Sequence, residues 1–388
     1  MLDTPARAGA GQAHLAGGGD LPLILSWQEP APGGMTALRA VRYDGGRWTA
    51  PRTIAQGTNW FINWADFPSV VPLGPSLMIA HWLVLKPDQR YAYDIAYALS
   101  DDGGESWSET RILNADTEIA EHGFVSFFGW GEDIGAVWLD GRAIAALSID
   151  ELFELEDPVG MTLRFARLDA GGRVLERGEI DDLVCDCCQT DAVTSAAGPL
   201  IVYRDRTTDE VRDIAIRRAV VTTAGSGDAA TARWSEPVVL GPDGWRIDGC
   251  PVNGPAMNAA GDYVGVAWFT AADDRPRLRF ARSRDAGRAF EAAVTVASQN
   301  VLGQADIVLT ADGTAWISAW HRAAAGMELR VHRLGVGAQD VDTRVVATSA
   351  SSLPSDVPQL GLSGEQLILA WSELGNPGRL YSARLPLW

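Results

Sequence analysis

Short apolar segments recur along the chain, each carrying an aromatic residue and each bounded by turns rich in glycine, aspartate or asparagine. The seven aromatic markers of these segments are Trp27, Trp82, Trp138, Tyr203, Trp268, Trp320 and Trp371. Successive markers lie 51 to 65 residues apart, which is the spacing expected when one four-stranded β unit repeats. After most apolar segments comes one in which apolar and polar residues alternate, as in LRFARLD and LRFARSRD, and this alternation is typical of a half-buried strand.

The repeat predicts a β-propeller. Several units continue through a turn into a Trp-led strand such as RWTAPRTI or RWSEPVVL, which brings the number of strands per unit to four. No helical pattern separates the units, and radial repetition is one way in which a β protein limits its exposed sheet edges. We therefore predict an all-β fold, a single propeller domain over residues 1–388 with seven four-stranded blades. Six blades, with the two terminal units sharing one, is the alternative. The last unit ends after its third strand, so the residues before Gln12 are predicted to supply the missing strand and close the ring.

Two turns share a more specific pattern, S-x-D-x-G-x-x-[WF]. They are SDDGGESW, from Ser100 to Trp107, and SRDAGRAF, from Ser283 to Phe290. The Asp is expected to accept backbone N–H groups in the turn, the Gly to adopt a positive φ, and the aromatic ring to pack between strands. This pattern resembles the Asp-box, or BNR repeat, of the sialidase superfamily. The resemblance implies a sialidase-like propeller, but an Asp-box is a structural turn and implies no activity by itself.

Composition and charge narrow the range of partners. The chain has 388 residues, of which 47% are hydrophobic, so it can bury a core without staples. Its net charge of −18 disfavours nucleic acids and anionic membrane surfaces. No apolar run is long enough to insert into a membrane, and the first residues have no signal-peptide core. We expect a monomeric, secreted or periplasmic protein whose leader is not in the given sequence, with a cytoplasmic location as the open alternative.

The propeller topology predicts which loops meet. If the first strand of each blade is innermost, the loops that lead into it from the preceding blade (D→A loops) share a face with the loops between second and third strands (B→C loops). The D→A loops carry Asp66, Glu121, His122, Cys185, Asp186, Cys187, Cys188, Cys250 and Asn253, and the B→C ends carry His81, Arg204 and Arg206. All four cysteines thus fall on one face, and polar groups that converge at the axial mouth define the expected site.

Three interpretations of the cysteines are open. Disulfides are expected in an oxidising compartment, and Cys187 or Cys188 could pair with Cys250 if their loops are neighbours. A metal site is the leading interpretation, because thiolates with a nearby imidazole suit Cu(I) or Zn(II). Copper is the first choice, zinc the second, and the protein holds neither if the cysteines are only disulfides. The expected ligands are Cys185, Cys187, Cys188, Cys250 and His122. In the third interpretation, one thiol is a nucleophilic or redox centre activated by a neighbouring arginine or histidine.

The leading functional hypothesis is a metal-dependent enzyme acting on a small molecule or peptide, with Asp66, His81, Arg204 and Arg206 facing the substrate. The alternative is an exo-sialidase with structural disulfides. Enzymes of that superfamily grip a carboxylate with three arginines, but their early Arg-Ile-Pro motif is missing here. Arg204 and Arg206 also lie in YRDRTTDEVRD, a mixed-charge segment typical of a salt-bridged hairpin. A non-enzymatic propeller that binds a small molecule, peptide or glycan is the third hypothesis.

Overall fold

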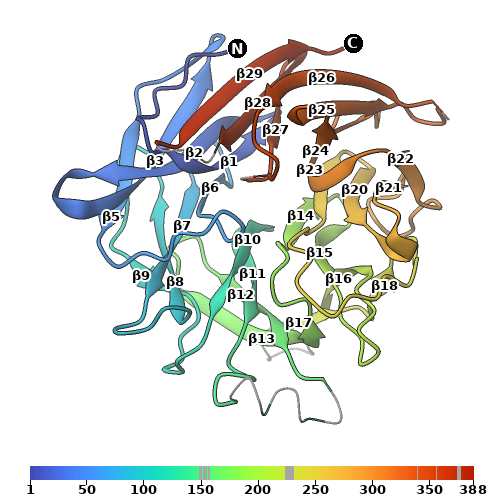
Figure 1. Ribbon diagram of the computed structural model, residues 1–388. Coiled ribbons are helices and arrows are strands. Elements are labelled where there is room, and N and C mark those ends of the chain that lie inside the picture. The colour runs from blue at the N-terminus through green and yellow to red at the C-terminus, as the bar shows by residue number, and fades with distance from the viewer. Residues whose placement is uncertain are drawn as a thin grey trace.

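Seven antiparallel sheets are arranged around a central axis in the computed structural model (Figure 1). The structure describes residues 1–147, 151, 155, 158–222, 231–338, 340–354, 356–373 and 377–388. The chain runs around the ring one sheet at a time, so that each sheet is one blade and its first strand is the innermost. The predicted all-β propeller with seven blades is confirmed, and the six-blade alternative is wrong.

The strands of each blade follow one another in sequence. Blades 1 and 2 contain β1 (Gly11–Gly18), β2 (Leu21–Ala31), β3 (Met35–Asp44), β4 (Arg47–Trp48) and β5 (Arg52–Gly57), then β6 (Ser69–Pro72), β7 (Met78–Leu85), β8 (Tyr93–Ser100) and β9 (Arg111–Ile112). Blades 3 and 4 contain β10 (His122–Trp130), β11 (Asp133–Asp140), β12 (Met161–Leu168) and β13 (Val174–Val184), then β14 (Asp191–Ser195), β15 (Gly198–Arg204), β16 (Ile214–Thr222), β17 (Thr231–Trp234) and β18 (Val238–Val239).

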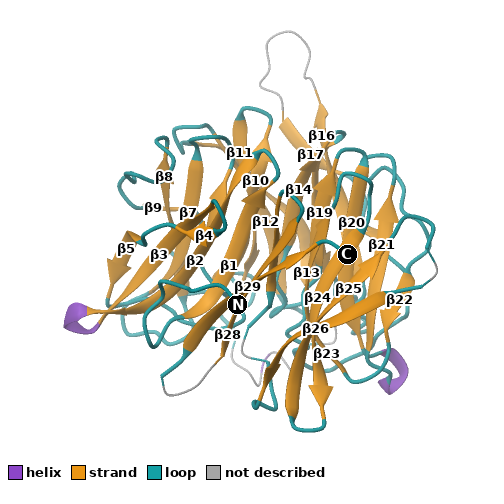
Figure 2. Cartoon of the chain, turned by 90° about the horizontal axis from the view of Figure 1, so that it is seen from above, coloured by secondary structure: helices purple, strands orange, loops and turns teal. Residues whose placement is uncertain are grey.

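The remaining three blades repeat the plan. They contain β19 (Ala256–Ala260), β20 (Tyr263–Thr270), β21 (Arg277–Ser283) and β22 (Val294–Ala297), then β23 (Val301–Leu309), β24 (Ala315–Ala323), β25 (Gly326–Leu334) and β26 (Asp342–Ser349), and finally β27 (Gln359–Ser363), β28 (Gln366–Glu373) and β29 (Arg379–Pro386). Two short 3₁₀ helices, η1 (Pro32–Gly34) and η2 (Ala272–Asp274), occupy B→C loops (Figure 2). In the described part of the chain no helix is long and apolar enough to cross a membrane.

The aromatic markers explain the repeat physically. Each lies in the second strand of its blade and is buried, with an exposed fraction between 0% and 3%. A large ring at this position fills the space between neighbouring sheets, and burying it contributes a substantial share of the hydrophobic stabilisation. The spacing of the markers therefore reports the spacing of the blades.

The N-terminal segment closes the ring, as predicted. Leu2 pairs with Ser382 of β29, and its amide donates to the Ser382 carbonyl at 2.8 Å. Further along the same edge, the Gly9 amide donates to the Gly378 carbonyl at 2.7 Å. Residues 2–9 thus lie along the third strand of blade 7, and the two ends of the chain lie close together (Figure 1). Pairing the first and last segments in one blade removes an open edge from the ring.

Buried carboxylates join the innermost strands to one another. Asp191 on β14 accepts the Met257 amide of β19 at 2.6 Å, and Asp306 on β23 accepts the Leu360 amide of β27 at 2.6 Å. Burial raises the pKa of each of these two carboxyls to about 7. These groups hold adjacent blades in register around the central cavity of about 220 Å³.

The two S-x-D-x-G turns form the predicted hydrogen bonds. Asp102 Oδ1 accepts the Ser106 amide at 2.9 Å, and Asp285 Oδ1 accepts the Ala289 amide at 2.9 Å. Both turns connect the third and fourth strands of their blades, at the end of the propeller opposite the D→A loops. They shape the fold and contribute nothing to the cysteine face.

Candidate metal centre and adjoining pocket

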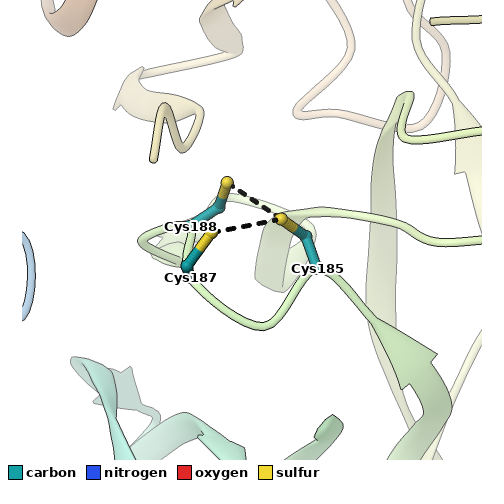
Figure 3. Close-up of side chains that lie close together, drawn as sticks. All are labelled: Cys185, Cys187 and Cys188. Atoms are coloured by element: carbon teal, nitrogen blue, oxygen red, sulfur yellow. Dashed lines mark hydrogen bonds between the residues drawn. The ribbon is translucent and has the colours of Figure 1, made fainter. Parts of the chain in front are cut away.

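Three cysteines gather in the D→A loop that joins β13 to β14. Cys185 Sγ lies 3.1 Å from Cys188 Sγ and 4.0 Å from Cys187 Sγ (Figure 3). All three sulfur atoms lie within 4.8 Å of one another. Cys185 and Cys188 are buried, Cys187 is half-buried, and all are free thiols. The sequence C-x-C-C therefore brings three soft donors together within four residues.

The fourth cysteine approaches from the next D→A loop, as predicted. Cys250 is exposed and lies close enough to Cys187 for the interaction between the two thiols to lower the pKa of Cys250. Gly254 lets the two loops touch, because a Cβ at this position would clash with the backbone of Gln189. Val252 in the same loop has φ +47°, a left-handed conformation that a β-branched residue rarely adopts.

Neighbouring groups favour a thiolate at Cys185. Hydrogen bonds from Cys187 and Cys188, and then the positive charge of Arg204, hold the pKa of Cys185 well below its usual range. The same interactions raise the pKa of Cys187, and burial raises that of Cys188. Arg212 Nη1 also donates to Cys185 Sγ at 3.5 Å. The loop thus favours ionisation of Cys185 over that of Cys187 and Cys188, and a lowered pKa is typical of a reactive or ligating cysteine.

Arg204 is buried, so its predicted position facing the substrate is not what the structure shows. Its guanidinium donates to the carbonyl of Asn253 at 2.8 and 3.1 Å, to that of Phe269 at 2.7 Å and to that of Arg212 at 2.7 Å. Its charge also lies over the ring of Trp245. Arg204 therefore fixes the loop that carries Cys250 to blade 4.

Arg206 forms ion pairs with two carboxylates. It donates to Glu210 at 2.6 Å and to Asp186 Oδ2 at 3.1 Å. Glu210 in turn accepts from Arg212 at 2.9 Å. The mixed-charge segment is thus the salt-bridged hairpin that the alternating signs indicated. Through Asp186, which also accepts the Met161 amide at 2.7 Å, this network holds the cysteine loop in place.

His122 belongs to a different cluster from the cysteines, which separates it from the predicted ligand set. Its Nε2 lies 3.2 Å from Asp116 Oδ2 and 3.7 Å from Asp140 Oδ2. Arg142 pairs with both of these carboxylates. The Nδ1 atom of His122 lies 3.0 Å from the carbonyl oxygen of Tyr93. The preceding residue, Glu121, lines a pocket together with Cys187, but the His122 ring points toward the carboxylates.

His81 has no exposed surface and does not face the mouth. Its Nδ1 is hydrogen-bonded to Ser69 Oγ at 2.8 Å. Burial, with a smaller effect of His14, lowers the pKa of His81 to about 3, so the ring is neutral at physiological pH. Its position in β7 explains the difference, because its side chain packs inside the blade and not at the end of the strand.

Asp66 is buried in the wall between the central cavity and a second pocket beside the cysteines, and its predicted role towards a substrate stays a prediction. It accepts the Phe124 amide at 2.7 Å and the Tyr93 hydroxyl at 3.0 Å. Burial is the main cause that raises its pKa to about 7, and Glu121 adds to the shift. Sequence reasoning missed Tyr93, because it begins a third strand that otherwise reads as a packing element.

The fold and the side chains together define a seven-bladed propeller with a cysteine cluster in its D→A loops. No protein-family model matches the sequence, and no curated protein sequence matches it. The microbial sialidase Hz136 (Hadza) has a similar structure, with a TM-score of 0.51 at 12% identity over 91% of this chain and 74% of the sialidase. A protein of unknown function from Dyadobacter fermentans has a TM-score of 0.50 at 13% identity over 98% of this chain and 95% of that protein. At such identities the likeness shows a sialidase-like fold alone.

Proposed function

We propose that this propeller binds a soft metal ion through Cys185, Cys187 and Cys188, with Cys250 as a further ligand. The three sulfur atoms within 4.8 Å of one another carry the proposal. Metal–sulfur bonds of about 2.3 Å place sulfur atoms about 3.8–4.0 Å apart in tetrahedral or trigonal sites. The Cys185–Cys187 distance of 4.0 Å fits this spacing, and the Cys185–Cys188 distance of 3.1 Å has to widen by only about 0.8 Å.

Cu(I) is the preferred ion and Zn(II) the alternative. Thiolates are the ligands that both ions take, but Zn(II) in a structural site almost always needs four. Here three sulfurs come from one short loop, and the fourth belongs to an exposed residue in another loop. A low-coordinate ion fits this arrangement best. Arg204 and Arg212 would offset the negative charge that the bound thiolates add.

Metal analysis tests the proposal directly. Protein purified without chelator and under reducing conditions should take up one equivalent of Cu(I) in competition with bicinchoninate. Cys185→Ser and Cys188→Ser should each weaken binding about 100-fold, because each removes a sulfur ligand from the ion. Cys250→Ser removes only the exposed fourth ligand and keeps the three-sulfur group, so it should weaken binding only about tenfold. Less than about a tenth of an equivalent of any transition metal, with no uptake of Cu(I) or Zn(II), would refute a metal site.

A disulfide is the second candidate, because Cys185 Sγ and Cys188 Sγ lie only 3.1 Å apart. A thiol count on the protein unfolded without reductant separates the two candidates. Four thiols in the metal-free protein support the metal site, whereas two or none would indicate disulfide staples.

The exo-sialidase alternative gains no support from the cavities. Neither the central cavity nor the pocket beside the cysteines is lined by a described arginine or lysine. Recognition of a sugar carboxylate depends on such cations. A fluorogenic sialoside assay would decide the matter, and we expect no turnover.

A further inference from the structure

A pocket beside the cysteine loop combines aromatic walls with acidic groups. Its volume is about 250 Å³, and it lies where the loops of blades 2, 3 and 4 meet. Its lining includes the aromatic residues Phe61, Trp64 and Tyr91 and the acidic residues Glu121 and Asp186. Cys187 forms part of the wall, so the pocket adjoins the thiol cluster.

The aromatic rings are packed against one another and leave surface free for a ligand. Phe61 stacks on Tyr93 with ring centroids 4.1 Å apart and planes tilted by 10°. Tyr91 meets Phe61 edge to face, with centroids 6.4 Å apart. Tyr91 is 56% exposed, so its ring does not belong to the core. Stacked rings of this kind are held rigidly and present electron-rich faces.

The carboxylates of the pocket differ in how their charge is balanced. Asp186 forms an ion pair with Arg206, and Asp66 accepts hydrogen bonds from a backbone amide and from the Tyr93 hydroxyl. Glu121 also has a hydrogen bond with Tyr93, but it makes no ion pair with any basic residue in the described part of the chain. Burial, followed by the charge of Asp186, raises the pKa of Glu121 to about 7. No described arginine or lysine lines the pocket, although the guanidinium carbon of Arg90 lies 5.2 Å from the centroid of the Tyr91 ring. A positively charged ligand would therefore balance the negative charge of Glu121 in the pocket.

We propose that this pocket binds an organic ammonium group, with Glu121 as its counter-ion and the aromatic rings as its walls. A cation over aromatic faces is attracted by their quadrupoles, and the attraction grows when water is excluded. The net charge of −18 also raises the local concentration of cations and repels anionic ligands. This inference goes beyond metal binding and does not depend on it, because the thiols only form one edge of the pocket.

A pair of probes of equal shape tests the charge requirement. Benzylamine and benzyl alcohol are titrated by calorimetry into the reduced, metal-free protein at about pH 8, above the raised pKa of Glu121 and below that of the amine. We expect benzylamine to bind at least about tenfold more tightly than benzyl alcohol, since only the amine is charged. Glu121→Gln keeps the shape of the side chain and should abolish this difference. Tyr91→Ala should weaken both probes by removing part of the wall.

Glu118→Gln is the matched control, because Glu118 is an exposed carboxylate in the same loop. This variant should bind benzylamine as the wild type does. Equal affinities of the two probes for the wild type, no binding of benzylamine, or an unchanged preference in Glu121→Gln would each overturn the proposal. Cu(I) uptake is measured on the same samples, so failure of the ammonium site and failure of the metal site are distinguished.

Discussion

Replacing Arg204 by methionine tests whether this residue holds the Cys250 loop against blade 4 or acts on a ligand. Methionine preserves much of the length and apolar stem of the side chain but has neither charge nor donors. In the wild type the guanidinium is 2% exposed and donates four hydrogen bonds to the carbonyls of Asn253, Phe269 and Arg212. All of these bonds are lost in the variant, and the acceptors stay in the protein interior.

The expected loss follows from these contacts. A hydrogen bond to a charged group contributes about 1.5–3 kcal/mol, and an unsatisfied buried acceptor costs about 1–3 kcal/mol. The bonds share one donor group and are not additive, so we expect the free energy of unfolding of Arg204→Met to fall by about 3–5 kcal/mol. Because the charge of Arg204 also stabilises the Cys185 thiolate, Cu(I) affinity should fall as well.

Chemical denaturation followed by tryptophan fluorescence measures the change in the free energy of unfolding. The control is Arg284→Met, since Arg284 pairs with Glu291 where the two side chains are 49% and 44% exposed. Exposed pairs contribute little, so the control should lose less than about 1 kcal/mol. If Arg204→Met were no less stable than this control, the tie between the Cys250 loop and blade 4 would not exist in solution.

Two further predictions concern the histidine cluster and the central cavity. His122→Gln should leave Cu(I) affinity within about twofold of the wild type, because the ring faces Asp116 and Asp140; a loss comparable to that of Cys188→Ser would return His122 to the ligand set. Burial raises the pKa of Asp306 from 3.8 to about 7, so the folded protein holds a proton that the unfolded chain releases. The stability from this group is complete below about pH 4 and is lost as the pH rises through about 7. Asp306→Asn should therefore flatten part of the decline in unfolding temperature between about pH 5 and pH 8, and an unchanged decline would contradict the shift.

The repeat made the fold predictable, and it also placed the cysteines correctly. Each blade must bury one large ring at the same place, so the spacing of Trp27 to Trp371 in the sequence reports the architecture directly. Once strand order is known, the D→A loops must meet at the mouth, which brings Cys187 to Cys250 across more than sixty residues. Ring closure by the N-terminal segment followed from the same count of strands.

Side-chain direction was not predictable from this topology. His81 and Arg204 are expected near the mouth from their position in the chain, yet both are buried. His81 lies in the middle of β7 and packs inside the blade, and Arg204 ends β15 with its side chain directed inward. His122 begins β10 directly after Glu121, but the two side chains face different surroundings, and only Glu121 lines the pocket. The alternation of a strand cannot be extended reliably into a loop.

The mixed-charge segment next to the cysteines reduces the electrostatic repulsion between a thiolate at Cys185 and the nearby carboxylates. A thiolate at Cys185 beside carboxylates would be destabilised, since like charges at short range disfavour ionisation. Arg212 faces Cys185, and Arg206 neutralises Asp186, so the negative charge near the thiols is balanced on that side. Glu121 has no such partner and keeps its attraction for a cation on the aromatic side. If the pocket binds an ammonium group as proposed, this asymmetric placement of the arginines would direct the cation toward Glu121 and away from the sulfur atoms.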